Sequence, residues 1–364
     1  MFERLDKSCM LRRGFLAAGG ALALAGLGFG SGHARAAEEL NALVWCDHTD
    51  PALIQPFEEK HGVKVNLKEY EGTGTALALL EQSQPGDWDV FVVDGVDVPR
   101  VVEAGLLTEL PVDQLPLDDV FDAVQMRDVT FKDGKMYAIM EKFGYNVISY
   151  NRAKVDAADM RDLSTLWSDK YKGRIAVYDY YIPLMDLVAL KLGMKPSDIN
   201  DGNLSDIRDA LFELKDNSVM VGEVISSTTA LATGEADILI GGGEWAVAVL
   251  QADNPDLDWV LPDQGGILWS QSLAIFKDSQ KQDLALEFVK YIMSPEGQAR
   301  LATSSCFWGM PANRKAGAAL SDEQKRGLRW DEQDDFLAKS HRYFIPDAEL
   351  DSKMLDVWTE FLQH

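Results

Sequence analysis

Histidine, cysteine and basic side chains are scarce in this sequence, and each scarcity excludes a class of function. The 364 residues include 5 histidines and 3 cysteines, and no H-E-x-x-H pair or C-x-x-C spacing indicates a zinc or redox site. Neither a G-x-S-x-G elbow nor a dinucleotide or Walker loop occurs, so the common hydrolase and nucleotide sites have no support. We therefore expect no enzyme, no cofactor and no metal.

Positive charge is the second scarcity. Lysine and arginine number 35 against 59 acidic residues, which gives a formal charge of −24 at pH 7. Such a surface repels nucleic acid and anionic lipid and attracts cations, so we expect no nucleic-acid partner. Beyond the first forty residues, no run is long and apolar enough to cross a membrane, which takes about 20 residues. The sequence leaves open whether Cys46 and Cys306, which lie far apart, form a disulfide.

Residues 1–36 have the pattern of an export signal. A polar start is followed by Arg12-Arg13-Gly14-Phe15-Leu16, and residues 17–30 are apolar and uncharged. Ala34-Arg35-Ala36 then supplies small residues at the two positions that a signal peptidase recognises. The paired arginines favour the twin-arginine route. The sequence therefore predicts cleavage after about Ala36 and a periplasmic location.

Strands and helices alternate along the remaining residues. The first series has strands over 40–45, 63–70 and 89–93, with helices over 51–61, 75–82 and 98–104; Asp50 is the expected cap of the first helix. Two strands, 136–143 and 146–151, follow around Gly144. A second series has strands over 174–178, 219–222, 238–241, 259–261 and 266–276, with helices between and after them, and the tail from about 321 is helical.

Such alternation predicts α/β lobes with mostly parallel sheets and helices on both faces. We assign 37–143 plus 271–318 to an N-terminal lobe and 144–270 plus 319–364 to a C-terminal lobe. Open α/β sheets bind ligands beyond the carboxyl ends of their strands. Two lobes that face each other therefore predict a hinge and a central ligand cleft.

Four stretches carry a family pattern through most of residues 40–318. They are 43–47 with 57–65, 88–93 with 104–107, 234–237, and 265–275 with 295–301 and 311–313. In their order and spacing they resemble the extracellular solute-binding proteins of ABC transporters, specifically the spermidine/putrescine-binding branch. The resemblance implies the two-lobed type II periplasmic-binding fold, a polyamine or related small cation as ligand, and an inner-membrane ABC permease as partner. We expect a monomer.

The resemblance also implies a ligand site in which carboxylates hold ammonium groups and aromatic rings clamp the methylene chain. The expected ligand residues are Trp45, Cys46, Asp47, Thr49, Asp94, Tyr180, Ser227, Glu244, Trp245, Trp269, Gln271 and Trp308. Several depart from the family pattern. Gln271 stands two residues beyond Trp269, where the family has an acid, and Asp94 stands where it has a serine. These departures leave the resemblance to the family intact, but they make the identity of the ligand less certain to follow from it.

Some of these residues have plainer explanations in the sequence. Asp47, Asp94 and Glu244 each follow a strand and are equally explained as helix caps. One of Tyr180 and Tyr181 is expected to face the cleft and the other the core. The hydroxyls of 226–229, Ser227 among them, are expected to cap a helix, and the free amides of such a helix start would also hold a carboxylate. An alternative ligand is an amino acid derivative, a thiamine-like cation or a metal cation. A third hypothesis is that the protein is a secreted α/β enzyme.

Overall fold

The computed structural model describes residues 38–364. Its strands are β1 (Glu38–Val44), β2 (Val63–Glu69), β3 (Val90–Asp94), β4 (Phe131–Lys132), β5 (Lys135–Met136), β6 (Ala138–Asn151), β7 (Ile175–Tyr178), β8 (Ser218–Gly222), β9 (Ile238–Gly242), β10 (Leu257–Val260), β11 (Ile267–Ile275), β12 (Met310–Pro311) and β13 (His341–Arg342). Its α-helices are α1 (Pro51–His61), α2 (Thr73–Glu81), α3 (Val98–Glu103), α4 (Asp122–Gln125), α5 (Arg127–Thr130), α6 (Tyr181–Lys191), α7 (Leu204–Asn217), α8 (Val224–Thr233), α9 (Glu244–Val247), α10 (Gln282–Met293), α11 (Pro295–Ala302), α12 (Asp322–Leu328), α13 (Gln333–Lys339) and α14 (Ala348–Gln363). The element order confirms the predicted α/β class.

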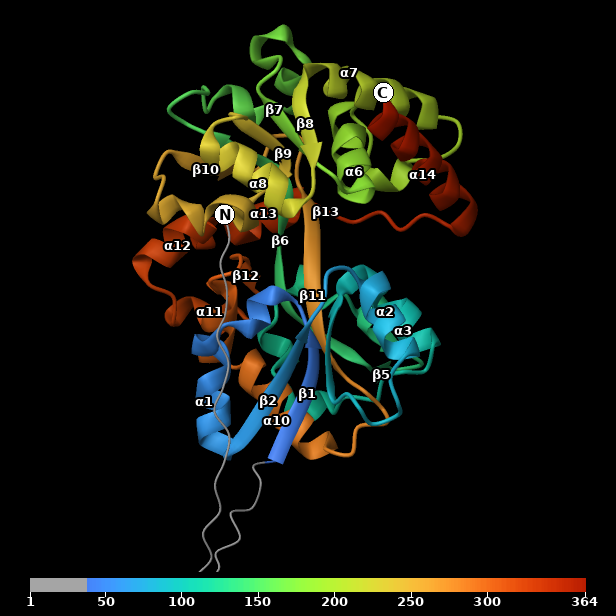
Figure 1. Ribbon diagram of the computed structural model, residues 1–364, viewed down its shortest axis with the longest axis vertical. Coiled ribbons are helices and arrows are strands. Elements are labelled where there is room, and N and C mark those ends of the chain that lie inside the picture. Colours follow the sequence, from blue (N-terminus) through green and yellow to red (C-terminus); the bar gives the residue numbers. More distant parts are fainter. Residues whose placement is uncertain (1–37) are drawn as a thin grey trace, which may run out of the picture. The chain divides into compact units, whose positions relative to one another are not determined.

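Two long strands connect the two halves of the sheet. Its order is β2-β1-β3-β11-β6-β9-β7-β8, and β6 and β11 run through both halves (Figure 1). We call β1–β3 with α1–α3, α10 and α11 the first lobe, and β7–β10 with α6–α9 and α14 the second. The prediction of two strands around Gly144 was wrong, because β6 is continuous and pairs Gly144 with Trp269 of β11.

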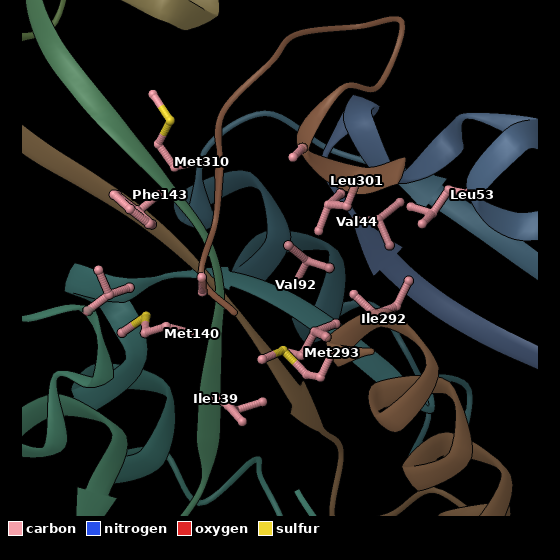
Figure 2. Packing of buried hydrophobic residues seen from close by; sticks show 14 of the residues in the cluster. Val44, Leu53, Val92, Ile139, Met140, Phe143, Ile292, Met293, Leu301 and Met310 are labelled. Atoms are coloured by element: carbon pink, nitrogen blue, oxygen red, sulfur yellow. The ribbon is translucent and has the colours of Figure 1, made fainter. Parts of the chain in front are cut away.

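Both faces of the first-lobe sheet are buried, as the apolar run of β3 predicts. Val90 and Val92 point to the face that α1, α10 and α11 cover, where Leu53 and Ile292 pack (Figure 2). Phe91 points to the opposite face, in the cluster that α2 and α3 complete. Since successive side chains of a strand alternate, helices on both faces explain a strand without polar positions. Asp50 caps α1 by accepting from the amide of Ala52, as expected.

The second lobe repeats this arrangement. Alternate residues of β9 enter different clusters: Ile238 and Ile240 join α6, α7 and α14, and Leu239 joins α8 and α9. The parallel strands β7, β8 and β9 all end at the same edge. Tyr178 closes β7 at that edge, and Tyr180 precedes α6 there.

The tail contacts both lobes. Between α11 and α13, Gln324 donates to the hydroxyl of Thr303 at 3.0 Å, while the indole of Trp259 donates to the carbonyl of Gly327 at 3.0 Å. Further along, α14 packs in the second-lobe core through Met354 and Phe361. The tail is helical in three segments as expected, with an extended stretch between α13 and α14 that carries β13.

Candidate functional site

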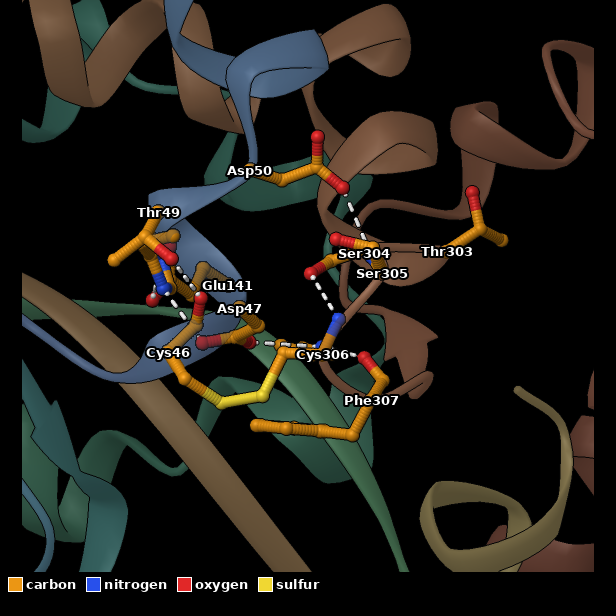
Figure 3. Close-up of polar contacts among 12 residues, drawn as sticks. Cys46, Asp47, Thr49, Asp50, Glu141, Thr303, Ser304, Ser305, Cys306 and Phe307 are labelled. Atoms are coloured by element: carbon orange, nitrogen blue, oxygen red, sulfur yellow. Dashed lines mark hydrogen bonds and ion pairs between the residues drawn. A yellow bond between two sulfur atoms is a disulfide. The ribbon is translucent and has the colours of Figure 1, made fainter. Parts of the chain in front are cut away.

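The chain turns sharply after β1 and is fixed there by a disulfide. Residues 46–49 form a single 3-10 turn, in which the hydroxyl of Thr49 donates to the carbonyl of Cys46 at 2.7 Å. Cys46 is bonded to Cys306, with their Cα atoms 6.0 Å apart (Figure 3). That spacing is typical of a disulfide. The bond joins the end of β1 to the loop between α11 and β12, so it decides the pairing that the sequence left open.

Asp47 is an internal ion-pair partner. Its side chain is fully buried, with the Nζ of Lys142 at 2.8 Å and the Nδ1 of His48 at 2.9 Å. Burial alone would raise the pKa of Asp47, but Lys142 and then His48 outweigh it and hold that pKa well below its usual range. Its charge is therefore already compensated inside the protein. The structure does not place Asp47 among the residues open to a ligand.

The same ion-pair network continues to β6. Burial opposes the charge of His48, but Glu141 and Asp47 raise its pKa to about 10, so the imidazole is protonated. Its Nε2 lies 3.0 Å from Glu141, without the alignment of a hydrogen bond. Lys142 also donates to the carbonyl of Phe307 at 3.0 Å and lies 4.0 Å from that ring's centre. Two acids and two cations balance, as a buried network requires.

A β-bulge explains why neighbouring residues of β6 share this network. The register between β6 and β11 shifts between Gln271 and Ser272, and no residue of β11 pairs with Glu141. A bulge residue changes the direction of the side chains next to it. Glu141 and Lys142 are consecutive, yet both contact the turn after β1. No pattern among the neighbouring residues indicates this bulge.

Asp94 differs from Asp47 in having no internal cation beside its carboxylate among the residues that the structure describes. It ends β3, is half-buried, and has no Lys, Arg or His partner among residues 38–364. Burial, followed by the nearby carboxylates of Asp97 and Asp47, raises the pKa of Asp94 to about 8. Its partner across the ladder is Gln271 of β11, whose buried Oε1 accepts no hydrogen bond within the described part of the chain. The carboxylate of Asp94 and the side-chain oxygen of Gln271 are therefore open to a positively charged or hydrogen-bonding partner.

Four tyrosines lie near enough to this carboxylate for its charge to act on them, and we call them the tyrosine cluster. Burial raises the pKa of each, and the charge of Asp94 adds to the effect in all four. Their rings come from both lobes and from the tail: Tyr70, Tyr178, Tyr180 and Tyr343. Tyr180 and Tyr343 meet edge to face with ring centres 5.7 Å apart. Aromatic faces around a carboxylate form a site that favours an organic cation.

Further acids lie around the cluster. The charges of Glu71, Asp179 and Glu223 also raise the pKa of Tyr178, after burial and Asp94. Asp97 acts in the same way on Tyr180. Of these acids, Asp179 is engaged, since it accepts from the indole of Trp358 at 3.0 Å. The surroundings of the tyrosine cluster are therefore strongly negative.

Tryptophans complete the site. Trp45 packs against Tyr70 with ring centres 5.7 Å apart, and Trp245 packs against Tyr178 at 5.3 Å. Trp269 is half-buried. Within residues 38–364, the buried indole nitrogen of Trp245 finds no acceptor, whereas the indoles of Trp45 and Trp269 face Tyr70 and Glu244 and act to lower the pKa values of those two groups. Buried donors are nearly always paired in folded proteins, so the unpaired indole of Trp245 beside Tyr178 indicates a place where a ligand belongs.

Glu244 lies behind Trp269. It is fully buried and accepts from the amide of Tyr145 at 3.2 Å. Burial raises the pKa of Glu244 to about 8. A side chain at Gly144 would overlap both the Glu244 carboxyl and the Trp269 ring, which is why this position of β6 is a glycine. Glu244 therefore supports Trp269 where β6 and β11 pair.

The remaining predicted residues lie elsewhere. Ser227 is not part of a helix cap, because α8 begins at Val224 with Glu223 as its N-cap; the buried Ser227 hydroxyl donates to the carbonyl of Glu223 at 2.7 Å. Trp308 packs next to Gly327 of α12. Its neighbour Phe307, which is not among the residues predicted from the sequence, packs against Trp269 with ring centres 6.0 Å apart.

Tyr70, Tyr178 and Tyr343 were also missed. Tyr70 and Tyr178 stand where β2 and β7 end, so the rule that sites follow strands could have found them. Tyr343 lies in the extended part of the tail, and its position depends on tertiary contacts that no local pattern shows.

Comparison with known proteins assigns this chain to a family. A model of the family described as bacterial extracellular solute-binding protein matches residues 52–326. The chain belongs to this family. Among curated relatives of this solute-binding protein is the spermidine/putrescine-binding periplasmic protein of Escherichia coli K12, which is 28% identical over 293 residues, covering 79% of this chain and 81% of the relative. The putrescine/cadaverine-binding protein of Pseudomonas aeruginosa is 25% identical over 293 residues, covering 77% and 81%.

Solved structures confirm the fold. The spermidine/putrescine ABC transporter substrate-binding protein of Streptococcus pneumoniae superposes with a TM-score of 0.77 at 19% identity, covering 90% of this chain and 99% of that one. The solute-binding protein therefore has the predicted two-lobed fold. No helix within residues 38–364 is long and apolar enough to cross a membrane. The predicted export signal, 1–36, lies outside the described residues.

Proposed function

We propose that this solute-binding protein captures a small organic cation of the polyamine type. The carrying observation is Asp94, a half-buried carboxylate without a cationic partner in the described part of the chain, near the tyrosine cluster. An ammonium group would form charge-assisted hydrogen bonds with it, and the rings would face the cation and its methylene chain. The acidic charge of the whole chain would draw such ligands towards it.

The relatives support the same ligand class. The names of the Escherichia coli and Pseudomonas aeruginosa proteins give spermidine, putrescine and cadaverine as what those proteins bind. The acid that the resemblance leads us to expect at position 271 is a glutamine here, while Asp94 lies directly opposite it on β3. We infer that the ligand carboxylate has moved across one strand pair and that its role is retained.

A second ligand class has one observation in its favour. The indole N–H group of Trp245 is a donor without an acceptor within residues 38–364. A ligand that carries oxygen as well as an ammonium group, such as an amino acid derivative, would satisfy this donor. This class shares the ammonium group with the polyamines, so Asp94 keeps its role in both.

The role in transport follows from the family. We propose that residues 1–36 direct export to the periplasm by the twin-arginine route, that the remaining protein is a monomer without catalytic activity, and that it delivers its ligand to an inner-membrane ABC permease. The lobes, with the boundaries 37–143 plus 271–318 and 144–270 plus 319–364, would close on the ligand about β6 and β11. Closure would then signal the loaded state to the permease.

A thermal-shift screen tests the proposed ligand class. Spermidine, putrescine and cadaverine are compared with succinate, which has four carbons like putrescine but carries negative carboxylates at its two ends. A ligand at 100 times its Kd stabilises the protein by about 2.7 kcal/mol, which gives a clear rise in Tm. We expect at least one polyamine to raise Tm and succinate to leave it unchanged. No shift with any amine would contradict the proposal.

A further inference from the structure

A cavity of about 360 Å³ lies beside the candidate site. Its walls come from the first lobe, from β11, from the turn before α7 and from the extended part of the tail. Small-molecule pockets occupy roughly 300–1,000 Å³, so the cavity is large enough for part of a ligand.

The cavity adjoins the surroundings of Asp94. Gly95 and Val96, the two residues that follow Asp94, line it, and so does Tyr343 of the tyrosine cluster. A side chain at Gly95 would overlap the hydroxyl of Ser270, another lining residue, so the backbone of residue 95 forms the wall there. Tyr343 thus faces the cavity while its ring meets Tyr180 of the cluster. Tyr343 therefore lies between the cavity and the surroundings of Asp94.

The tail segment that closes the cavity is held on three sides. Arg342 donates to both oxygens of Asp128 at 2.8 Å each, the hydroxyl of Tyr343 donates to Asn146 at 2.6 Å, and the amide of Phe344 donates to Asp186 at 3.0 Å. Asp128 belongs to α5, Asn146 to β6 and Asp186 to α6 of the second lobe. The family model ends at residue 326, before this segment.

The chemistry of the cavity differs from that of the tyrosine cluster. Among residues 38–364, Asp128 is the only acid in the lining of the cavity, and both its oxygens are engaged by Arg342. Burial, with the charge of Lys195, lowers the pKa of His341, so this imidazole is neutral at pH 7. The rest of the lining is largely apolar, with Met126, Val129 and Leu268. An ammonium group would gain no partner here, whereas an uncharged arm would gain apolar contact.

We propose that the cavity is a second compartment of the ligand site and takes the uncharged end of an amine whose ammonium group lies at Asp94. The ligand is then a polyamine derivative with one end capped, such as an N-acylated diamine, in preference to the free diamine. This proposal rests on the proposed function for its ammonium end. Its new content is the neutral arm, which passes Tyr343 into the cavity.

Ser197 offers the test, because it lines the cavity yet is exposed, so substitutions there leave the core intact. Calorimetric titration with putrescine and N-acetylputrescine measures the preference of the wild-type protein and of three variants. Ser197→Trp fills the cavity, and Ser197→Asp adds a carboxylate to it. Ser205→Trp is the matched control, since Ser205 is an exposed position of α7 outside the cavity lining.

We expect N-acetylputrescine to bind the wild-type protein at least tenfold more tightly than putrescine. That advantage should disappear in Ser197→Trp, shift towards putrescine in Ser197→Asp, and persist in Ser205→Trp. Equal or tighter binding of putrescine by the wild-type protein, or an advantage unchanged in Ser197→Trp, would overturn the second compartment and leave the proposed function standing. Failure of both amines to bind the wild-type protein would overturn the proposed function and this inference with it.

Discussion

Asp94 and Gln271 face each other across strands β3 and β11. Directly opposed residues of an antiparallel pair have Cβ atoms about 4.5–5.5 Å apart, so a charge at either position reaches the same space. In this solute-binding protein the acid stands on β3 and the amide on β11. We propose that this one carboxylate holds the ammonium group of the ligand.

Replacing Asp94 with Asn should weaken cation binding most. A hydrogen bond to a charged group contributes about 1.5–3 kcal/mol, which corresponds to roughly a 10- to 100-fold loss of affinity. Calorimetric titration with the best polyamine measures the loss. Asp118→Asn removes an exposed acid distant in sequence from the site and should leave the affinity unchanged. Equal affinities of the Asp94 variant and the wild-type protein would remove Asp94 from the site.

The raised pKa of Asp94 predicts a pH dependence of opposite sign for ligand affinity and for stability. Because an ammonium group binds the ionised carboxylate, affinity should fall by up to tenfold per pH unit as the pH drops below about 8. The unligated protein should instead lose stability as the pH rises from about 4, the ordinary value in an unfolded chain, to about 8, since only the folded state keeps the proton.

Two series of measurements check this prediction. Titrations from pH 6 to pH 9 follow the affinity, and melts of the unligated protein follow the stability. In Asp94→Asn both dependences should flatten, and the variant should be the more stable protein near pH 8. A wild-type affinity that is constant between pH 6 and pH 8 would contradict the assignment of this pKa.

The sequence predicted much of the fold because its patterns are local. The apolar run of β3 and the Asp50-Pro51 start of α1 each depend on neighbouring residues. The site was predicted less completely, because its key relations are tertiary. Whether Asp47 or Asp94 faces a ligand depends on Lys142, which lies on another strand and compensates only Asp47. Nothing in the order of residues near either aspartate reveals that difference.

Lys142→Met should destabilise the protein strongly. It leaves Asp47 buried without its main partner, and removing one member of a buried ion pair costs about 3–5 kcal/mol. Urea unfolding of the variant measures the free energy of unfolding. The double variant Lys142→Met/Asp47→Asn removes the orphaned charge and should recover a large part of the loss. A single variant within 1 kcal/mol of wild type would show that Asp47 is not compensated by Lys142.

Loss of the Cys46–Cys306 disulfide should also lower stability. The bond closes most of the chain, with a sequence separation of 260, and removal of a native disulfide typically costs 2–5 kcal/mol. Thermal melts with and without a dithiol reductant measure the effect, and the double variant Cys46→Ser/Cys306→Ser should melt at the lower temperature in both conditions. A wild-type Tm that the reductant leaves unchanged, with the bond shown by mass to be reduced, would contradict a stabilising role.

The measurement that tests the central claim most directly is a calorimetric titration of the purified protein with putrescine and with succinate, repeated with Asp94→Asn. We predict that putrescine binds the wild-type protein, that the Asp94 variant loses at least tenfold of that affinity, and that succinate binds neither. Binding of succinate, or putrescine binding that is the same in both proteins, would contradict a cation site built on Asp94.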